Sequence, residues 1–556
     1  MDTKRLILFV IFSFSILMLW ESWQKKDLPI IPQVATTVKQ EGGIPSAVVN
    51  SSAGNVNSSV PVTDSTFKLD SAQRIHVATD LFQADIDTMG GDLRRLTLNK
   101  HRASDTQENF VLLDDAAKPM LYVAQTGLIG SPTLALPTHK SLFTSAATSY
   151  TMAEGANATD VRLSWAGNGI SVDKIYTFHR NSYVIDVTYR INNGSAAAIT
   201  PSVYYQILHD NKSNQGSKMM PTFTGGAYYT EADKYKKIKF GDMAKEKLSK
   251  TSNDGWVGLV QHYFAGAWIP KAGVVREYYT DKLSDDVFSI GAVTPLGSVS
   301  PGAKTELKAE LFLGPQTHND LVAAAPGLEY TVDYGWLTVI AKPIFWILTK
   351  IQAVVINWGV AIILLTLLIK LAFFPLSAAS YKSMAKMREL APRLQVLKEK
   401  FGDDRQKMQQ AMMEMYKTEK INPMGGCLPI LVQVPVFISL YWVLLGSIEL
   451  RHAPFFGWIH DLSAIDPYYI LPILMGATMI IQTKLNPKPT DPVQAKVMQI
   501  MPVVFSIFFF FFPAGLVLYW LVNNILSIAQ QWYINKTIHA ETLASKALSN
   551  KVSVKR

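Results

Sequence analysis

The sequence is poor in cysteine and in charge. A single cysteine, Cys427, stands among 556 residues, and this excludes any disulfide within the chain. Charged residues make up 17% of the chain and hydrophobic residues 48%, which is too apolar for an ordinary soluble protein. The composition therefore predicts several membrane spans joined to a water-soluble part whose core alone stabilises it.

Motifs for nucleotide use and for common hydrolytic chemistry are also missing. No G-x-x-x-x-G-K-[ST] loop, H-E-x-x-H pair or G-x-S-x-G elbow occurs. The ten histidines are scattered and lack metal-ligand spacing. We therefore expect no enzyme activity, no cofactor, no metal site and no nucleic acid as a specific ligand.

The first segment has the pattern of a signal anchor. Lys4 and Arg5 precede an apolar run that ends at Leu19, and neither a small-residue cleavage site nor a lipoprotein cysteine follows. This predicts an uncleaved transmembrane helix over residues 1–23. Residues 24–63 are rich in Ser, Asn, Gly and Pro without periodicity, which predicts a flexible tether.

Residues 64–332 have strand character. The stretch "VIDVTYRI" alternates, placing Ile185, Val187, Tyr189 and Ile191 on one face. "LFQADIDTMGG" and "ELKAELFLGP" behave in the same way. Many short strands separated by turn signals predict a large antiparallel β-sandwich, although the sequence gives no strand order.

The rest of the chain is predicted to be helical and largely within a membrane. Residues 333–356 mix apolar and aromatic residues with Lys342 and Lys350, which favours an interfacial amphipathic helix over a span. Residues 357–535 hold five apolar stretches, each near the ~20 residues that cross a bilayer; with the anchor they make six spans. They cover Trp358 to Phe374, Leu428 to Gly446, Tyr468 to Gln482, Val497 to Phe512 and Leu516 to Tyr533, the last two joined by a tight turn at Pro513.

Basic residues predict the orientation of these spans. The segment from Leu376 to Cys427 carries ten Lys and Arg against six Asp and Glu, and the tail over residues 536–556 carries five against one. Because loops rich in Lys and Arg stay in the cytosol, we expect both termini to be cytosolic. The sandwich would then lie outside the cytoplasmic membrane.

The cytosolic segment over residues 376–425 is predicted to be a helical hairpin, with Asp403 or Asp404 as the N-cap of its second helix. Its apolar stripe is rich in methionine. One interpretation is a seam that packs the hairpin on itself, and the other is an adaptable surface for client chains; the two are compatible. The stripe consists of Met384, Met387, Met408, Met412 and Met415.

Lys370, in "AIILLTLLIKLAFFPLS", is the only charged residue inside the five predicted spans. The lack of acidic residues there counts against a coupled transporter. Lys370 lies five residues before Pro375, or about 7.5 Å along a helix, so its ammonium could reach water by snorkelling. The alternative is that it lines a wet groove.

Other polar residues favour the groove. Thr366 lies one turn before Lys370, and Gln433 is early in the next span. Polar side chains should face other helices or water rather than lipid; hydrogen bonding between helices is the simpler interpretation, and a groove open to the cytosol is the other. The last span adds Trp520, Asn523, Asn524, Ser527, Gln530 and Gln531.

Four long motifs carry a family resemblance: "SMAKMRELAPRLQVLKEKFGDDRQKM", "KINPMGGCLPILVQVPVF", "HDLSAIDPYYILPILMG" and "FPAGLVLYWLVNNILSIAQQ". The chain resembles the YidC membrane-protein insertases of Gram-negative bacteria over nearly its whole length. The resemblance implies an inner-membrane protein with a periplasmic sandwich similar to the galactose-mutarotase fold. It also implies a five-helix core with a hydrophilic groove closed to the periplasm.

The resemblance further implies function and partners. Insertases of this kind place nascent integral membrane proteins in the lipid bilayer without ATP, alone or beside the Sec translocon, and their hairpin and basic tail are linked with ribosome contact. The groove arginine of the family falls on Lys370, a departure that keeps the charge but loses the planar fork. The rival hypotheses are a channel or transporter with a carbohydrate-binding-like periplasmic domain, and a membrane-anchored carbohydrate-processing enzyme.

Overall fold

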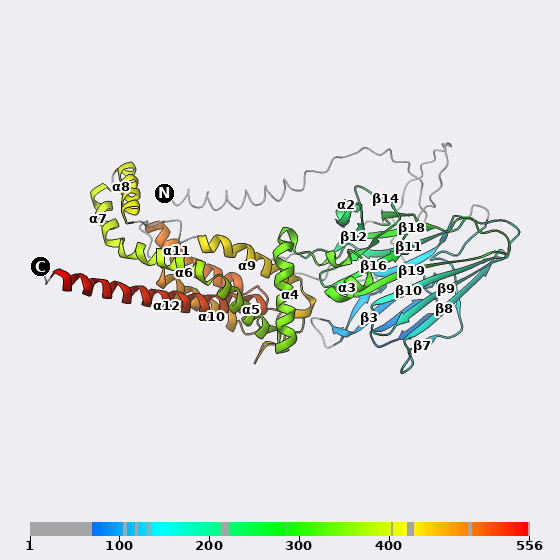
Figure 1. Cartoon of the computed structure of the whole chain (residues 1–556). Coiled ribbons are helices and arrows are strands. Elements are labelled where there is room, and N and C mark those ends of the chain that lie inside the picture. Colours follow the sequence, from blue (N-terminus) through cyan, green and yellow to red (C-terminus); the bar gives the residue numbers. More distant parts are fainter. Residues whose placement is uncertain are drawn as a thin grey trace. The chain divides into compact units, whose positions relative to one another are not determined.

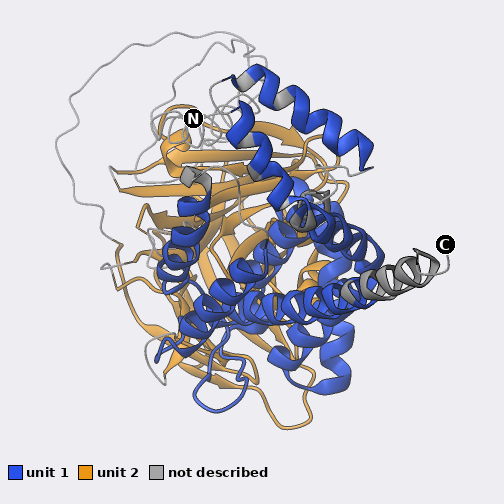
Figure 2. Ribbon diagram, turned by 90° about the vertical axis from the view of Figure 1, so that its left-hand side faces the viewer, with its two compact units in different colours: residues 1–35, 334–556 blue, residues 36–333 orange. Residues whose placement is uncertain are grey.

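The computed structural model describes residues 69–103, 108–116, 120–130, 134–212, 222–284, 286–401, 404–419, 428–486 and 492–553. The predicted signal anchor and tether lie outside these residues. The chain divides into two compact units, with the boundary between Asp333 and Tyr334 (Figure 2). The unit that precedes the boundary is built of strands, and the unit that follows it is helical (Figure 1).

The strand unit is a sandwich of two large sheets. The ten-stranded sheet has the order β14-β17-β18-β11-β5-β3-β2-β1-β7, with β4 paired to β3. Its strands are β1 (Arg74–Ala78), β2 (Phe82–Asp87), β3 (Asp92–Arg102), β4 (Asn109–Leu113), β5 (Tyr122–Ile129), β7 (Ser149–Thr151), β11 (Ser202–Asp210), β14 (Ser249–Ser252), β17 (Arg276–Lys282) and β18 (Val287–Pro295).

The nine-stranded sheet has the order β13-β12-β15-β16-β19-β10-β9-β8-β6. Short helices α2 (Phe240–Met243) and α3 (His318–Ala324) and the 3-10 helix η1 (Leu328–Thr331) complete the unit. The strands are β6 (Thr144–Ser145), β8 (Ala158–Gly167), β9 (Ile170–His179), β10 (Val184–Asn193), β12 (Gly225–Thr230), β13 (Lys234–Ile238), β15 (Trp256–Val260), β16 (Phe264–Pro270) and β19 (Lys304–Pro315).

Strand β10 confirms the alternation seen in the sequence. Ile185, Val187, Tyr189 and Ile191 are all buried, and β10 pairs antiparallel with both β9 and β19. Residues at steps of two share one face of a strand, so this face contributes to the core between the sheets. One pairing departs from the expected antiparallel pattern, because β7 joins β1 in parallel.

A buried charged cluster lies inside the sandwich. Lys174 on β9 is 0% exposed, and its Nζ donates hydrogen bonds of 2.9 Å to the carbonyl oxygens of Gly90 and Thr126. Asp92 on β3 lies 3.6 Å from the same nitrogen and 3.5 Å from Arg94. Burial lowers the pKa of Lys174 to about 8, against the opposing effect of Asp92. The cluster therefore joins the two sheets through charge as well as through apolar packing.

The helical unit follows the predicted order of segments. It starts with a 3-10 turn, η2 (Gly335–Leu337), and a further one, η4 (Ile448–Leu450), follows α9. The apolar stretches that we predicted each contain a helix, and the bounds of α9 agree with the prediction. The helices are α4 (Thr338–Val355), α5 (Trp358–Ala372), α6 (Phe374–Glu389), α7 (Ala391–Phe401), α8 (Arg405–Thr418), α9 (Leu428–Gly446), α10 (Ile470–Leu485), α11 (Pro492–Phe509) and α12 (Ala514–Ser553).

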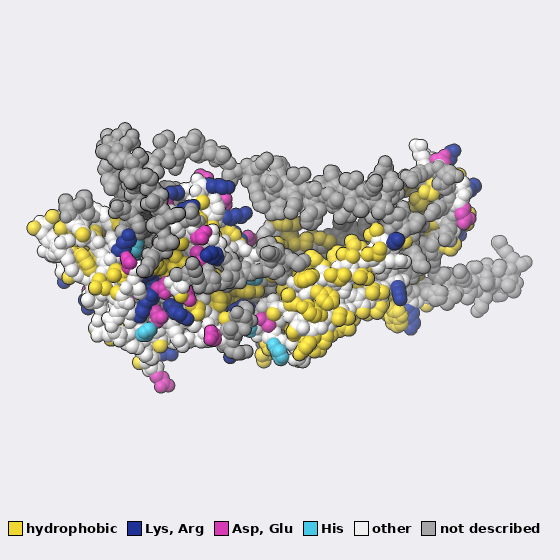
Figure 3. All heavy atoms as spheres, turned by 180° about the vertical axis from the view of Figure 1, so that it is seen from behind, with side chains coloured by type: hydrophobic (Ala, Val, Ile, Leu, Met, Phe, Trp, Pro, Cys, Tyr) yellow, Lys and Arg dark blue, Asp and Glu magenta, His cyan; other side chains and the backbone are white. Residues whose placement is uncertain are grey.

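Length and composition single out one described helix, residues 335–355, as able to cross a membrane by itself. A second candidate appears if α5 and α6, bent by 66° at their junction, form one broken span. The interfacial position of α4 and the count of six spans thus stay predictions. Figure 3 shows a broad hydrophobic surface over the helical unit. Exposed hydrophobic side chains of this unit include Leu371, Ile473 and Ile507.

The segment after Lys370 departs from the expected hairpin. Helix α6 contacts α9 and α12, so it belongs to the packed helical unit, and the chain then breaks at Leu390 before α7. Pro392 lies in the first turn of α7, a position that proline tolerates. Helices α7 and α8 pack together, with Asp404 capping α8 by accepting from the Lys407 N–H at 3.1 Å. The hairpin proper therefore comprises α7 and α8.

Candidate functional site

A cavity of about 240 Å³ lies among five helices of the helical unit. Helix α5 supplies Lys370, α9 supplies Gln433, and α12 supplies Asn524 and Ser527. These four residues are the part of the predicted groove that the structure brings together. The remaining lining residues come from α6, α10 and the residue that ends α10: Ser377, Ser380, Tyr381, Met384, Gln482 and Asn486.

Lys370 points into the packed unit. Its side chain is 8% exposed, and its Nζ donates a 2.7 Å hydrogen bond to the Ser527 hydroxyl. That hydroxyl donates its own proton to the carbonyl of Asn523 at 2.7 Å, so it meets Lys370 as an acceptor. An ammonium has three donors, and this is the one hydrogen bond that Lys370 makes to the described residues.

The cavity has a positive electrostatic character. Among its lining residues, Lys370 is the only basic group, and no Asp or Glu is present. The other polar groups are hydroxyls and amides. Because these neutral groups solvate charge without cancelling it, the cavity can attract an anionic group without binding it as a fixed ion pair.

Polar side chains also join α10 to α12 beside the cavity. Gln482 donates to the Gln531 side-chain oxygen at 2.7 Å, and the Gln531 amide donates to the Leu485 carbonyl at 3.2 Å. The amide of Asn524 lies 3.4 Å from the Thr478 hydroxyl. Part of the predicted last-span stripe thus serves helix–helix hydrogen bonding, as the simpler interpretation had it.

Several predicted groove residues lie away from the cavity lining. Thr366 is 1% exposed, and its hydroxyl donates to the Ile362 carbonyl in its own helix at 2.6 Å. Trp520 packs edge-on against Phe437 and Phe509, with ring centroids at 4.4 and 5.3 Å. Gln530 is buried, and its amide atoms have no hydrogen-bond partner among the described residues.

Sequence reasoning missed the contribution of α6. Ser377, Ser380 and Met384 follow one another at steps of three and four, which is the spacing of one helical face. We assigned these residues to the cytosolic hairpin because Pro375 suggested the end of a span. The bend between α5 and α6 instead turns this face toward the cavity.

The methionines divide between two places. Met384 lines the cavity, and Met387 is half-buried on the same helix. Met408, Met412 and Met415 are half-buried on α8. The structure thus separates the predicted stripe into a cavity part on α6 and a hairpin part on α8.

A packed loop lies at the start of α10. Asp466 is fully buried, where it accepts hydrogen bonds from the Leu471 N–H at 2.7 Å and the Trp458 indole at 2.9 Å. The N–H of Ala514 donates to the Ala464 carbonyl at 2.7 Å. The α11–α12 turn is thereby tied to this loop, which holds the first turn of α12 in place.

Comparison with known families decides the assignment. Residues 74–347 match the YidC periplasmic domain, and residues 350–541 match the 60Kd inner membrane protein family. The chain belongs to the YidC family of membrane protein insertases. It is accordingly an inner-membrane insertase with a periplasmic domain, and not an enzyme.

Relatives of this family match the chain from end to end. The membrane protein insertase YidC of Methylobacillus flagellatus is 68% identical, over 99% of this chain and 100% of its own. That of Aromatoleum aromaticum is 51% identical, over 98% of this chain and 100% of its own. The channel and carbohydrate-enzyme hypotheses are therefore dropped.

Solved structures are more distant. A crystal structure of an active YidC insertase is 19% identical, covers 84% of this chain and 93% of its own, and has a TM-score of 0.39. A galactose mutarotase related enzyme from Lactobacillus acidophilus is 9% identical, covers 44% of this chain and 97% of its own, and has a TM-score of 0.31.

Proposed function

We propose that the cavity around Lys370 is the groove through which this insertase receives the polar segment of a nascent membrane protein. The supporting observation is a buried ammonium with a single hydroxyl partner, in a cavity whose described lining holds no acidic residue. A polar or acidic client tail would find its hydration partly replaced by the hydroxyls and amides of the lining. The groove thereby shortens the hydrocarbon distance that the tail must cross.

The free-energy cost of moving a polar tail into the bilayer is small enough for the groups of this cavity to offset. A charged residue at the bilayer centre costs about 3 kcal/mol on insertion scales. One accessible ammonium and several neutral polar groups are enough to offset a cost of that size. Strong binding would hinder release, and release follows when the apolar part of the client partitions into lipid, driven by burial of its own apolar surface.

The orientation that we propose follows from the basic residues. Both termini and the α7–α8 hairpin would lie in the cytosol, with the cavity open to that side and the sandwich in the periplasm. The half-buried methionines of α8 would then offer an adaptable apolar surface to client chains. The ribosome and the Sec translocon are the further partners we propose, the former through the hairpin and the basic end of α12.

The test is a charge series at position 370. In vesicles with reconstituted protein, Lys370→Arg should keep the insertion of clients with acidic translocated tails, and Lys370→Glu should abolish it. Lys350→Glu, on α4, is the matched control and should insert normally. Photocrosslinking of a stalled client from positions 433 and 527, in proteins that carry each residue at position 370, should succeed only in the insertion-competent variants.

Two results would contradict this proposal. Normal insertion by Lys370→Glu would make the charge incidental. Crosslinks from α4 in place of the cavity would move the client path elsewhere on the unit.

A further inference from the structure

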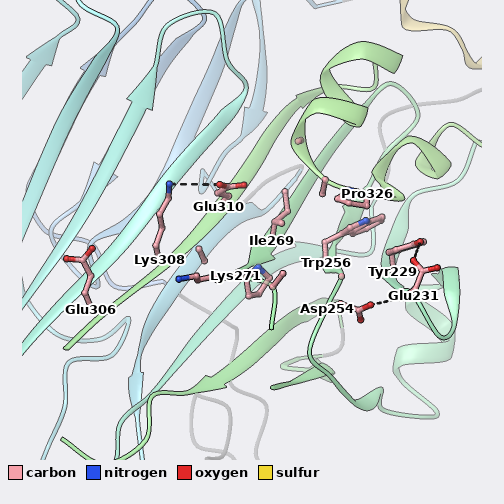
Figure 4. Close-up of a pocket in the computed structure, with 16 residues that line it drawn as sticks. Tyr229, Glu231, Asp254, Trp256, Ile269, Lys271, Glu306, Lys308, Glu310 and Pro326 are labelled. Atoms are coloured by element: carbon pink, nitrogen blue, oxygen red, sulfur yellow. Dashed lines mark hydrogen bonds and ion pairs between the residues drawn. The ribbon is translucent and has the colours of Figure 1, made fainter. Parts of the chain in front are cut away.

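The sandwich contains a pocket of about 730 Å³, a volume typical of small-molecule sites. Figure 4 shows its arrangement. Glu306, Lys308 and Glu310 lie at steps of two on β19 and so share one face of the nine-stranded sheet. The opposite end is formed by Tyr229, Trp256 and Pro326 (Figure 4).

Three of the four carboxylates in the lining already have close partners. Glu231 pairs with Lys234 and accepts from the Tyr229 hydroxyl at 2.8 Å. Glu306 lies 2.8 Å from Arg190. Asp254 accepts the Glu231 backbone N–H at 3.0 Å. Because these three carboxylates are already paired, they have little hydrogen-bonding or ion-pairing capacity left for a ligand.

Glu310 is different because it shares its cation. Lys308 lies 4.0 Å from Glu310 but only 2.8 Å from Asp186. Asp186 also lies 2.8 Å from the His179 ring, so the basic groups here are held closer to Asp186 than to Glu310, and partial burial raises the pKa of Glu310. Among the ion-paired carboxylates of the lining, Glu310 therefore has the most distant partner in the described chain.

The other end of the pocket suits an apolar group. The rings of Tyr229 and Trp256 are buried, and Ile269, Pro326 and neighbouring alanines extend the apolar wall. Aromatic rings also attract cations through their negative faces.

We propose that this pocket binds a small organic ammonium ion with an apolar body. Its ammonium would pair with the Glu310 carboxylate, while its body would lie toward Tyr229 and Trp256. Lys271 is exposed and makes no ion pair with the described residues. The positive charge of Lys271 repels an ammonium ligand. Removing Lys271 should therefore strengthen binding, whereas removing Glu310 should weaken it. The site is independent of the groove and of client insertion.

The experiment uses three fluorinated probes with one body and different charge. They are 2-(4-fluorophenyl)ethylammonium, 2-(4-fluorophenyl)ethanol and 3-(4-fluorophenyl)propionate. Binding to the full chain in nanodiscs is followed by fluorine NMR at pH 7. The ammonium probe should bind most tightly and the propionate least.

Variants then locate the site. Glu310→Gln should weaken the ammonium probe about tenfold, in line with the loss of a charge-assisted contact, and leave the alcohol unchanged. Lys271→Gln should strengthen it by about two- to threefold. The control is Glu306→Gln, on the same strand and in the same lining, whose carboxylate is already held by Arg190; it should change affinity less than twofold. Because nanodisc partitioning is common to all variants, differences between them report the pocket.

Three results would overturn the proposal. One is equal binding of the three probes. Another is an unchanged affinity in a Glu310→Gln protein that melts at the wild-type temperature. If that variant melts early, Glu310→Asp keeps the charge and must bind the ammonium probe more tightly than Glu310→Asn does; failure there also rejects the site.

Discussion

Lys174 in the sandwich and Lys370 in the helical unit are the two buried lysines of the described chain, and they are buried in different ways. Lys174 has two carbonyl acceptors and a carboxylate nearby. Three aromatic rings also surround it, with centroids at 5.7–5.8 Å. Lys370 has one hydroxyl acceptor and a cavity. The first ammonium is nearly saturated, whereas the second keeps donors to spare.

This difference is the one expected between a charge that stabilises the fold and a charge of the kind that we propose for Lys370. A buried charge with a full set of partners contributes to a unique fold, but it has little left for an outside group. A buried charge with few partners raises the free energy of the folded state, and it can still bind an outside group of opposite charge. Spare hydrogen-bonding capacity, more than burial itself, is what identifies Lys370.

The largest expected effect is on the saturated lysine. Lys174→Met should lower the free energy of unfolding of the sandwich by about 3–5 kcal/mol, because Asp92 loses one of its two buried cations and the carbonyl oxygens of Gly90 and Thr126 lose their donor. Urea unfolding of the full chain, followed by pulse proteolysis, measures this. Lys250→Met, which removes a half-buried pair with Asp233 at the surface, is the control and should cost less than about 1 kcal/mol. Equal losses in both variants would show that the buried cluster is not structural.

The next effect extends the comparison to a buried histidine of the sandwich. Burial lowers the pKa of His209 to about 4, against a carbonyl contact from Asp210 that raises it. Between pH 6.5 and 4 the His209 ring is protonated in the unfolded chain but stays neutral in the folded chain. Stability is therefore full above pH 6.5 and falls by about 3 kcal/mol as the pH drops to 4. Proteolysis-monitored unfolding at pH 7 and 4.5 should show this loss in the wild type.

A His209→Gln variant is the control for that measurement. It lacks the titrating ring, so its stability should change much less over the same pH range. An equally steep acid loss in this variant would assign the effect to other groups.

A smaller effect is expected from giving Lys370 the kind of partner that Lys174 has. Ser527→Asp places a carboxylate beside the ammonium and should reduce insertion of acidic-tail clients about tenfold, since charge-assisted hydrogen bonds contribute about 1.5–3 kcal/mol. Ser527→Asn, of similar size but neutral, should insert normally. Wild-type insertion by Ser527→Asp would mean that an unpaired ammonium is not required.

The smallest effect is expected from removing the partner altogether. Ser527→Ala leaves Lys370 with fewer acceptors and the same charge, so insertion should stay within about threefold of the wild type, as measured in vesicles. A loss comparable to that of Ser527→Asp would show instead that the hydroxyl itself positions Lys370.

The sequence was most informative where periodicity or rarity is strong. Strand β10 could be predicted with its buried face because apolar residues alternate along it, and α9 because a long apolar run has clear ends. Lys370 could be singled out because no other charge interrupts the predicted spans. Lys174, by contrast, lies in an ordinary strand, and nothing local indicates that Asp92 faces it from the other sheet.

The cavity was predicted only in part, for reasons of geometry. The bend between α5 and α6 depends on packing against α9 and α12, so the serines of α6 could not be placed from their spacing alone. Thr366 illustrates the opposite case, because it is not among the residues that line the cavity and its hydroxyl donates to a carbonyl of its own helix. Which polar side chains face a partner helix and which face a cavity is settled by the rotation of each helix about its axis.

The forty residues of α12 correspond to about 60 Å of continuous helix at 1.5 Å per residue, whereas a bilayer core is about 30 Å thick. Asn524 and Ser527 lie in its first half, and Lys546 and Lys551 lie in its second half. One continuous helix thus joins the wall of the cavity to the segment that carries Lys546 and Lys551. A force or rotation applied to that segment would be transmitted along one helix to Ser527, the hydrogen-bond partner of Lys370, without passing through any loop.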